Sequence, residues 1–120
     1  MTDDRRLLET LYAAFNARDI DGALVGMHGD VDWANGMDGG SVHGHDAVRD
    51  YWTGQWGQID PHVEPVGFSS GTPGEITVDV HQVVRDRAGN LRSDQMVQHI
   101  YVVEDGLIRS MRIRKPAAGA

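Results

Sequence analysis

Residues 75–103 have the sequence EITVDVHQVVRDRAGNLRSDQMVQHIYVV, and the rest of the chain is organised around this stretch. Two runs rich in β-branched residues, 75–85 and 93–103, flank the five residues DRAGN at 86–90. Gly89 can take the positive φ that a hairpin loop with an adjacent bulge requires. The pattern therefore predicts a β-hairpin whose loop is closed by Asp86 and Asn90.

Closing the loop in this way fixes the pairing of the two strands, because side chains alternate between the faces of a sheet. In this register Gln82 faces Asp94, and both lie on a mostly aliphatic face. That face holds Ile76, Val78, Val80, Gln82, Val84, Asp94, Met96, Gln98, Ile100 and Val102. The opposite, mixed face includes His81, His99 and Tyr101 and is expected to lie outside. An apolar face with a few polar groups is typical of the wall of a ligand cavity.

Composition limits the classes of partner. Eighteen acidic residues against eleven basic ones give the 120-residue chain a net charge of −7, which repels phosphate backbones, so no nucleic acid is expected. No apolar run approaches the ~20 residues of a membrane helix, and the first residues lack a signal peptide's apolar region. We therefore expect a cytoplasmic protein with no membrane partner. The length fits one domain, 1–120, with a core at about 5–113 and a frayed tail at 116–120.

Helical patterns precede the strands. Apolar residues at helical spacing predict a first helix that ends near Ala17, and Asp19 can cap a shorter second one. A short strand at 31–33 and a glycine-rich loop at 35–40 come before a third helix that begins near His45. An extended segment with Pro65 at an edge or bulge, the hairpin, and a last strand at 107–113 follow. This order predicts an α+β fold with an antiparallel sheet.

Three stretches resemble a known family. They are LYAAFNARDID at 11–21, VHGHDAV at 42–48 and VEDGLI at 103–108. They resemble, in order and spacing, the SnoaL-like proteins, which with ketosteroid isomerases and polyketide cyclases belong to the nuclear transport factor 2-like superfamily. The resemblance covers residues 5–113. It implies a cone-shaped barrel, in which a curved antiparallel sheet wraps on three N-terminal helices, and a homodimer through the outer face of the sheet.

The resemblance also places the catalytic positions of ketosteroid isomerases on this chain. The carboxylate base falls on Asn35, whose amide does not titrate. The protonated aspartic acid that donates to the oxyanion falls on Gln98, which still donates an N–H bond. The tyrosine donor falls on Leu11, one residue from Tyr12. Steroid isomerase chemistry is therefore not expected.

Asp94 is the acidic residue that the predicted register turns inward, beside Gln82. As a functional group it is a general acid or base whose pKa an apolar cavity raises, with Gln98 as the second catalytic residue. The structural alternative is a hydrogen-bonded pair near the hairpin end. Asp32 is a further candidate that strand alternation turns outward.

Aromatic and polar residues form the predicted ligand site. Aromatic side chains supply large apolar areas with a polar edge, which suits a small hydrophobic ligand, although plain core packing explains the same pattern. The predicted substrate-binding residues are Tyr12, Trp33, Asn35, Tyr51, Trp52, Trp56, Gln82, Met96 and Met111.

Six histidines raise the question of a metal site. His43 and His45 form the one close pair, but the glutamate that a cupin-type site needs is replaced by Arg49 and Asp50. His43 is better explained as a residue of the strand-to-helix junction. We expect no metal and no cofactor.

Three functions remain open from the sequence. One is an acid–base isomerase, cyclase or hydratase acting on a hydrophobic, carbonyl-bearing substrate. The second is a non-catalytic binder of a small hydrophobic molecule, which Asn35 at the base position favours. The third is a dimeric assembly domain whose interior is filled by side chains.

Overall fold

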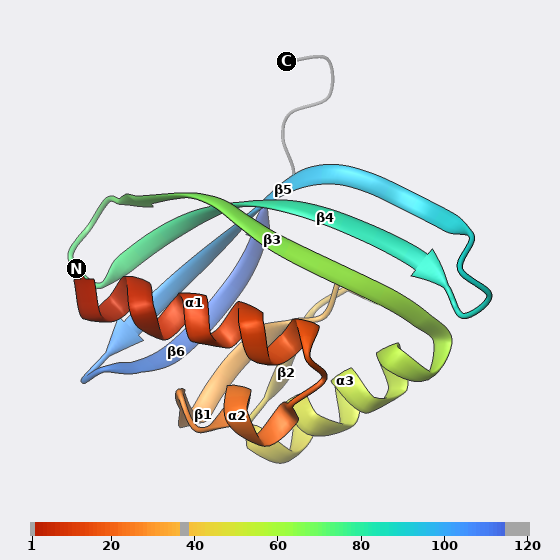
Figure 1. Cartoon of the computed structure of the whole chain (residues 1–120). Coiled ribbons are helices and arrows are strands. Elements are labelled where there is room, and N and C mark those ends of the chain that lie inside the picture. Colours follow the sequence, from red (N-terminus) through yellow and green to blue (C-terminus); the bar gives the residue numbers. More distant parts are fainter. Residues whose placement is uncertain (1, 37–38, 115–120) are drawn as a thin grey trace.

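The computed structural model describes residues 2–36 and 39–114, and the tail expected at 116–120 lies outside these residues. Figure 1 shows the helices α1 (Thr2–Asn16), α2 (Ile20–Leu24) and α3 (His45–Gln58) below an arched sheet. The strands are β1 (Met27–Ala34), β2 (Ser41–His43), β3 (Ile59–Ser70), β4 (Glu75–Asp86), β5 (Leu91–Glu104) and β6 (Leu107–Arg114).

The predicted hairpin is formed by β4 and β5, and its loop is closed as expected. The amide of Asp86 donates to the carbonyl of Asn90 at 2.8 Å, and Gly89 has a φ of 92°. The Asp86 carboxylate also accepts from the amides of Ala88 and Asn90. The face of β4 is predicted correctly too, because Ile76, Val78, Val80 and Val84 are buried.

The predicted register of β5 is wrong by one residue. Arg85 pairs with Leu91, but Val84 pairs with Ser93, so Arg92 is an extra residue that forms a β-bulge. Because side chains alternate, this single residue exchanges the two faces of β5. Val97, His99 and Tyr101 are buried, whereas Asp94, Met96 and Gln98 lie on the outer face.

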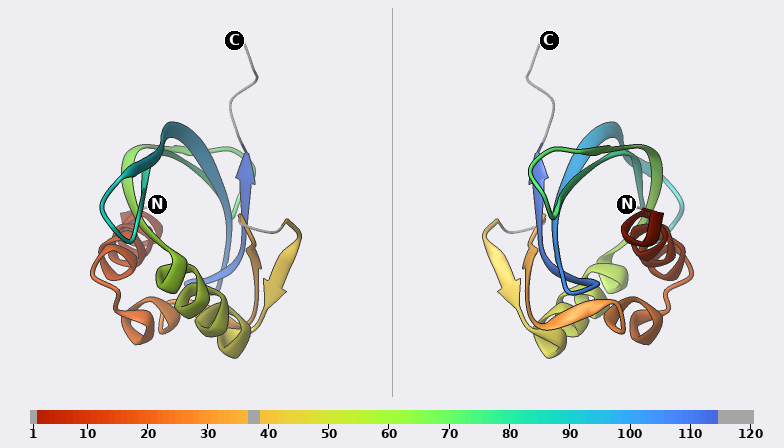
Figure 2. Two further views of the ribbon diagram at one scale, coloured as in Figure 1. Left: turned by 90° about the vertical axis from the view of Figure 1, so that its right-hand side faces the viewer. Right: turned by 90° about the vertical axis from the view of Figure 1, so that its left-hand side faces the viewer.

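The sheet is curved but not closed. Its strand order is β2-β1-β6-β5-β4-β3, with β2 and β3 at its edges, so the expected barrel does not close. The sheet is also not purely antiparallel, because β1 and β6 run parallel. Figure 2 shows the sheet bending around one side of the molecule while the helices lie across the other. Pro65 lies at an irregularity of the edge strand β3, as predicted.

The core fills the space between helices and sheet. Leu8, Leu11 and Tyr12 of α1 are buried, which confirms the helical stripe. Asp19 caps α2 by accepting from the amide of Gly22 at 3.0 Å. The strands β1 and β2 separate α2 from α3, so the helices do not form one N-terminal block. In the described part of the chain, each helix is too short or too polar to cross a membrane.

The bulge generates a prediction about deletions. Deleting Arg92 removes only the unpaired residue, so the faces of β5 stay unchanged, and we expect the free energy of unfolding to fall by about 1 kcal/mol or less. Deleting Met96 forces part of β5 to exchange faces, and we expect loss of cooperative unfolding. Urea unfolding followed by circular dichroism measures both. A Met96 deletion with native stability would contradict this account of the register.

Candidate functional site

A cavity of about 270 Å³ lies between α1, α3 and the inner face of the sheet. Its walls are mostly apolar and aromatic. Six of the residues predicted from the sequence line it: Tyr12, Trp33, Tyr51, Trp52, Gln82 and Met111. Trp33 and Trp52 meet edge to face, with ring centroids 5.4 Å apart. These two side chains therefore pack against each other and also line the cavity.

Asn35 and Trp56 lie beside the cavity but do not line it. Asn35 stands between Ala34 and Gly36, which do. Trp56 packs on Phe15, and the guanidinium of Arg18 lies over its ring at 5.0 Å from the centroid.

The expected catalytic pair does not face the cavity. The carboxylate of Asp94 is 53% exposed and lies 2.6 Å from His81 Nε2. Gln98 donates from Nε2 to Asp79 Oδ1 and accepts from Arg114 Nε, both at 2.8 Å. Met96, expected in the ligand site, is 42% exposed. The bulge at Arg92 is the reason, because it turns Asp94, Met96 and Gln98 outward. Asp94 is therefore not a candidate acid of the cavity.

A buried hydrogen-bond chain occupies the inner end of the cavity instead. The Tyr101 hydroxyl donates to the Tyr12 hydroxyl at 2.8 Å, and the Tyr12 hydroxyl lies 2.8 Å from His99 Nδ1. The rings of Tyr12 and His99 stack at an interplanar angle of 11°. All three residues line the cavity and are buried. These hydrogen bonds join α1 to β5.

Burial keeps the three side chains of this hydrogen-bond chain neutral. It lowers the pKa of His99 to about 4 and raises the pKa values of Tyr12 and Tyr101 above their ordinary range. Since Tyr101 donates to Tyr12, the proton of Tyr12 needs an acceptor, and Nδ1 of neutral His99 is the acceptor within reach. The imidazole proton is therefore assigned to Nε2.

His99 lines the cavity, and its second ring nitrogen, Nε2, is not used in the bond to Tyr12. Its hydrogen bond to Tyr12 is made through Nδ1. In the described residues, the buried side-chain atoms without a partner are Gln55 Oε1 and Trp56 Nε1, and His99 Nε2 is not among them. The three hydrogen-bonded residues thus leave one uncharged N–H donor, His99 Nε2, for a ligand.

The sequence contained a signal for this site. The resemblance predicts the oxyanion donor of ketosteroid isomerases at Gln98 and their tyrosine at Leu11, and each position is one residue away from a polar group that lines the cavity, His99 and Tyr12 respectively. The shift on β5 could have been corrected by requiring Val97, His99 and Tyr101 to share a face with Val78 and Val80, whereas the shift on α1 does not depend on the pairing of the strands. The bulge that makes this pairing possible leaves no distinctive sequence pattern.

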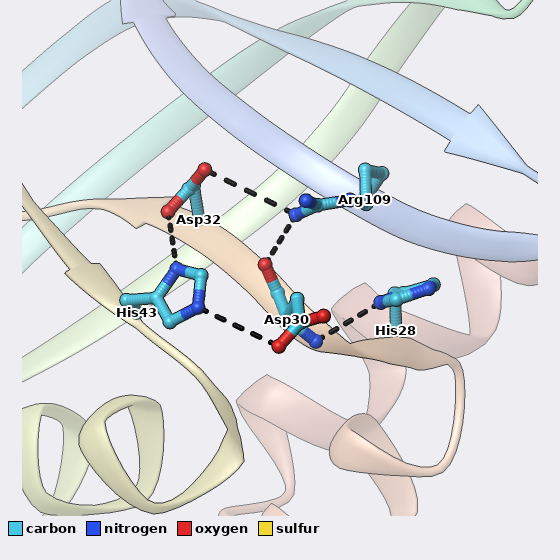
Figure 3. A network of polar contacts seen from close by, with 5 residues as sticks. All are labelled: His28, Asp30, Asp32, His43 and Arg109. Carbon is cyan, nitrogen blue, oxygen red and sulfur yellow. Dashed lines mark hydrogen bonds and ion pairs between the residues drawn. The ribbon is translucent and has the colours of Figure 1, made fainter.

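A second polar cluster lies on the outside, at β1, β2 and β6 (Figure 3). His43 Nδ1 lies 2.8 Å from Asp32 Oδ1, and Arg109 Nη1 donates to the carbonyl of Asp30. The hydrogen bond to Asp32 raises the pKa of His43. Asp32 points outward as expected, and the cluster links β2 to the neighbouring strands.

His43 and His45, the close histidine pair of the sequence, make separate contacts. His45 lies with Nε2 2.9 Å from the carbonyl of Met27, away from His43. In the part of the chain that the structure describes, no group of three metal-ligating side chains is found.

Comparison with known proteins identifies the family. The SnoaL-like domain family matches residues 8–111. A search of curated protein sequences finds no match. An NTF2-like protein of unknown function from Burkholderia pseudomallei superposes with a TM-score of 0.84 at 25% identity, over 98% of this chain and 94% of that one.

Two further solved structures share the fold. TerC, co-crystallised with polyporic acid, has a TM-score of 0.84 at 24% identity over 95% of this chain and 92% of its own. A Mycobacterium tuberculosis protein in complex with estradiol-17β-hemisuccinate has a TM-score of 0.81 at 21% identity over 96% and 95%. The family match spans most of the chain, and these likenesses agree with its fold. The chain therefore belongs to the SnoaL-like domain family and has the fold of nuclear transport factor 2-like proteins.

Proposed function

We propose that this protein binds a small, largely apolar molecule in the cavity and that His99 Nε2 donates a hydrogen bond to an acceptor oxygen of that molecule. The observation that carries the proposal is the neutral His99, held by Tyr12 at the inner end of an otherwise apolar cavity. A few placed polar groups in an apolar cavity are the usual means by which ligand pockets fix orientation.

The shape and chemistry of the walls favour a flat ligand. Trp33, Trp52 and Tyr101 present aromatic surfaces from β1, α3 and β5. Polyporic acid and estradiol-17β-hemisuccinate, the ligands of two proteins with this fold, support a ring-containing molecule of this kind, while the acidic groups that both carry are no part of this support. A cavity of about 270 Å³ is much larger than the ~30 Å³ of a water, which favours ligand binding over a filled assembly domain.

The lining favours binding over acid–base catalysis. Within the described residues, no lining side chain is a carboxylate, and neutral His99 with a lowered pKa is a poor base near pH 7. An isomerase or hydratase that moves protons through Asp94 is no longer proposed. Polarisation of a ligand carbonyl is the chemistry that His99 offers.

A homodimer through the outer face of the sheet remains part of the proposal. The surface differs from the one expected, because Gln95, His99 and Tyr101 line the cavity. Asp94 and Met96 take their place on that face, beside His81.

Sedimentation tests the dimer. We expect a species of twice 13.2 kDa, and we expect Met96→Asp to weaken it, because the change places a charge on the half-exposed apolar position of β5. Thr53→Asp, at an exposed position of α3, is the control. A 13.2 kDa species alone at high protein concentration would contradict the dimer.

The His99 donor is tested with 1-tetralone, whose only polar atom is a carbonyl oxygen, and tetralin, which lacks it. We expect the wild-type protein to bind tetralone more tightly, and His99→Phe to reduce tetralone affinity about tenfold while leaving tetralin affinity nearly unchanged. Quenching of tryptophan fluorescence measures both affinities, because Trp33 and Trp52 line the cavity.

Two tryptophan variants of β5 test whether the probes bind in the cavity. Ser93→Trp fills the cavity from β5 and should abolish binding, whereas Met96→Trp on the opposite face of the same strand should not. An equal loss of affinity for both probes in His99→Phe, or unchanged binding in Ser93→Trp, would contradict the proposed function.

The buried neutral His99 also predicts acid sensitivity. Its pKa is about 4 in the folded protein against an ordinary 6.5, so the unfolded chain binds a proton between these values that the folded protein does not. Stability contributed by His99 is complete above pH 6.5 and falls as the pH drops to 4, by about 3 kcal/mol in total. Urea unfolding at several pH values in this range gives the free energy of unfolding as a function of pH. This dependence should be shallower for His99→Gln than for the wild-type protein, and unchanged for the exposed His62→Gln. Parallel slopes for wild type and His99→Gln would refute the prediction.

A further inference from the structure

We infer that the cavity accepts its ligand only in an uncharged form and excludes oxyanions such as phenolates and carboxylates. This inference rests on the proposed function and adds the charge state of the ligand, which decides whether the site acts as a binder of neutral molecules or as a stabiliser of enolates.

The first observation is the absence of charge in the walls. The lining residues come from α1, β1, α3, β3, β4, β5 and β6, and in the described ranges none of them is Asp, Glu, Lys or Arg. The titratable side chains that face the cavity are Tyr12, Tyr51, His99 and Tyr101. The lining therefore supplies no cation to compensate an anion.

The second observation is that the hydrogen-bonded residues Tyr101, Tyr12 and His99 leave a single donor among them for a ligand. The proton of Tyr101 is used in the bond to Tyr12, and the proton of Tyr12 in the bond to His99. Of these three residues, only His99 has a proton left for a ligand oxygen, on Nε2. Sites that hold oxyanions use several converging donors or a positive charge, because an anion loses its whole hydration shell on entry.

The charged residues around the cavity do not make it more favourable for an anion. Arg18, near the rim, already donates to Asp60 and, at 2.7 Å, to the carbonyl of Pro61. On the outer face of β5, Arg114 is bound to Gln98 and Asp94 to His81. The net charge of −7 adds a field that repels anions.

The ligand class follows from these features. Ketones, ethers and un-ionised phenols can accept the His99 bond without bringing a charge into the cavity. Gln82, Gln95 and Ser93, at the hairpin end, offer neutral polar groups to the outer end of such a molecule. A phenol that binds here has a higher pKa in the complex than in water.

The experiment uses 3,5-dichlorophenol, which has a single oxygen, titrates at mildly alkaline pH and absorbs differently as phenol and phenolate. We expect a constant Kd from about pH 6 to the pKa of the free phenol, and a tenfold rise in Kd for each pH unit above it. The bound ligand should keep the absorption of the neutral phenol. Constant or tighter binding above that pKa, with the absorption of phenolate, would overturn the inference.

Two lysine variants sharpen the test. Gln82→Lys places a cation in the cavity wall, so we expect it to bind phenolate and to reverse the pH trend. His81→Lys changes the neighbouring position on the outer face of β4, where the side chain contacts Asp94, and should behave as wild type. An unchanged trend in Gln82→Lys would show that wall charge does not control the ligand's charge, and would also overturn the inference.

Failure of the proposed function gives a different result. Absence of binding at every pH, or binding that Ser93→Trp leaves intact, would overturn the cavity as a ligand site and this inference with it. Binding that Ser93→Trp abolishes, but that favours phenolate, would leave the proposed function standing and overturn the inference alone.

Discussion

The bulge at Arg92 is the constraint on which the rest of the structure depends. One unpaired residue determines that Val97, His99 and Tyr101 face the helices, and that Asp94, Met96 and Gln98 face outward. The alternation of side chains along a strand turns this local irregularity into a change of the whole inner surface. The carboxylate of Asp94 would otherwise stand in the cavity, and the site would have a different charge and a different chemistry.

The chain from Tyr101 through Tyr12 to His99 gives the cavity its polarity. Three polar groups buried in an apolar interior are costly unless each is hydrogen-bonded, and here each partner satisfies the next. The result is rigid and neutral, because burial disfavours ionisation of all three groups. Among these three residues, a single N–H, on His99, remains for a ligand. The same contacts join α1 to β5, so the site and the core share their stabilising interactions.

The SnoaL-like fold supports enzymes as well as binding proteins, so the side chains of the cavity must carry the functional argument. The resemblance places the carboxylate base of ketosteroid isomerases on Asn35, which stands beside the cavity, and on β5 the polar side chain that lines the cavity is His99 in place of the expected Gln98. The amide of Asn35 does not titrate, and burial keeps the imidazole of His99 uncharged near pH 7. These two properties favour a protein that selects a neutral molecule over one that moves its protons.

The sequence determined the elements and the family. The hairpin loop at 86–90, the inward face of β4, the buried stripe of α1 and the cap at Asp19 depend on local periodicity and turn chemistry, which are written in neighbouring residues. Tyr12, Trp33, Trp52 and Gln82 could be assigned to the cavity for the same reason. The tertiary structure alone decided the face of β5, the open sheet with its parallel β1–β6 pair, and the meeting of Tyr12 with His99. These features depend on pairing between distant segments, where a shift of one residue has little local signature but exchanges inside and outside.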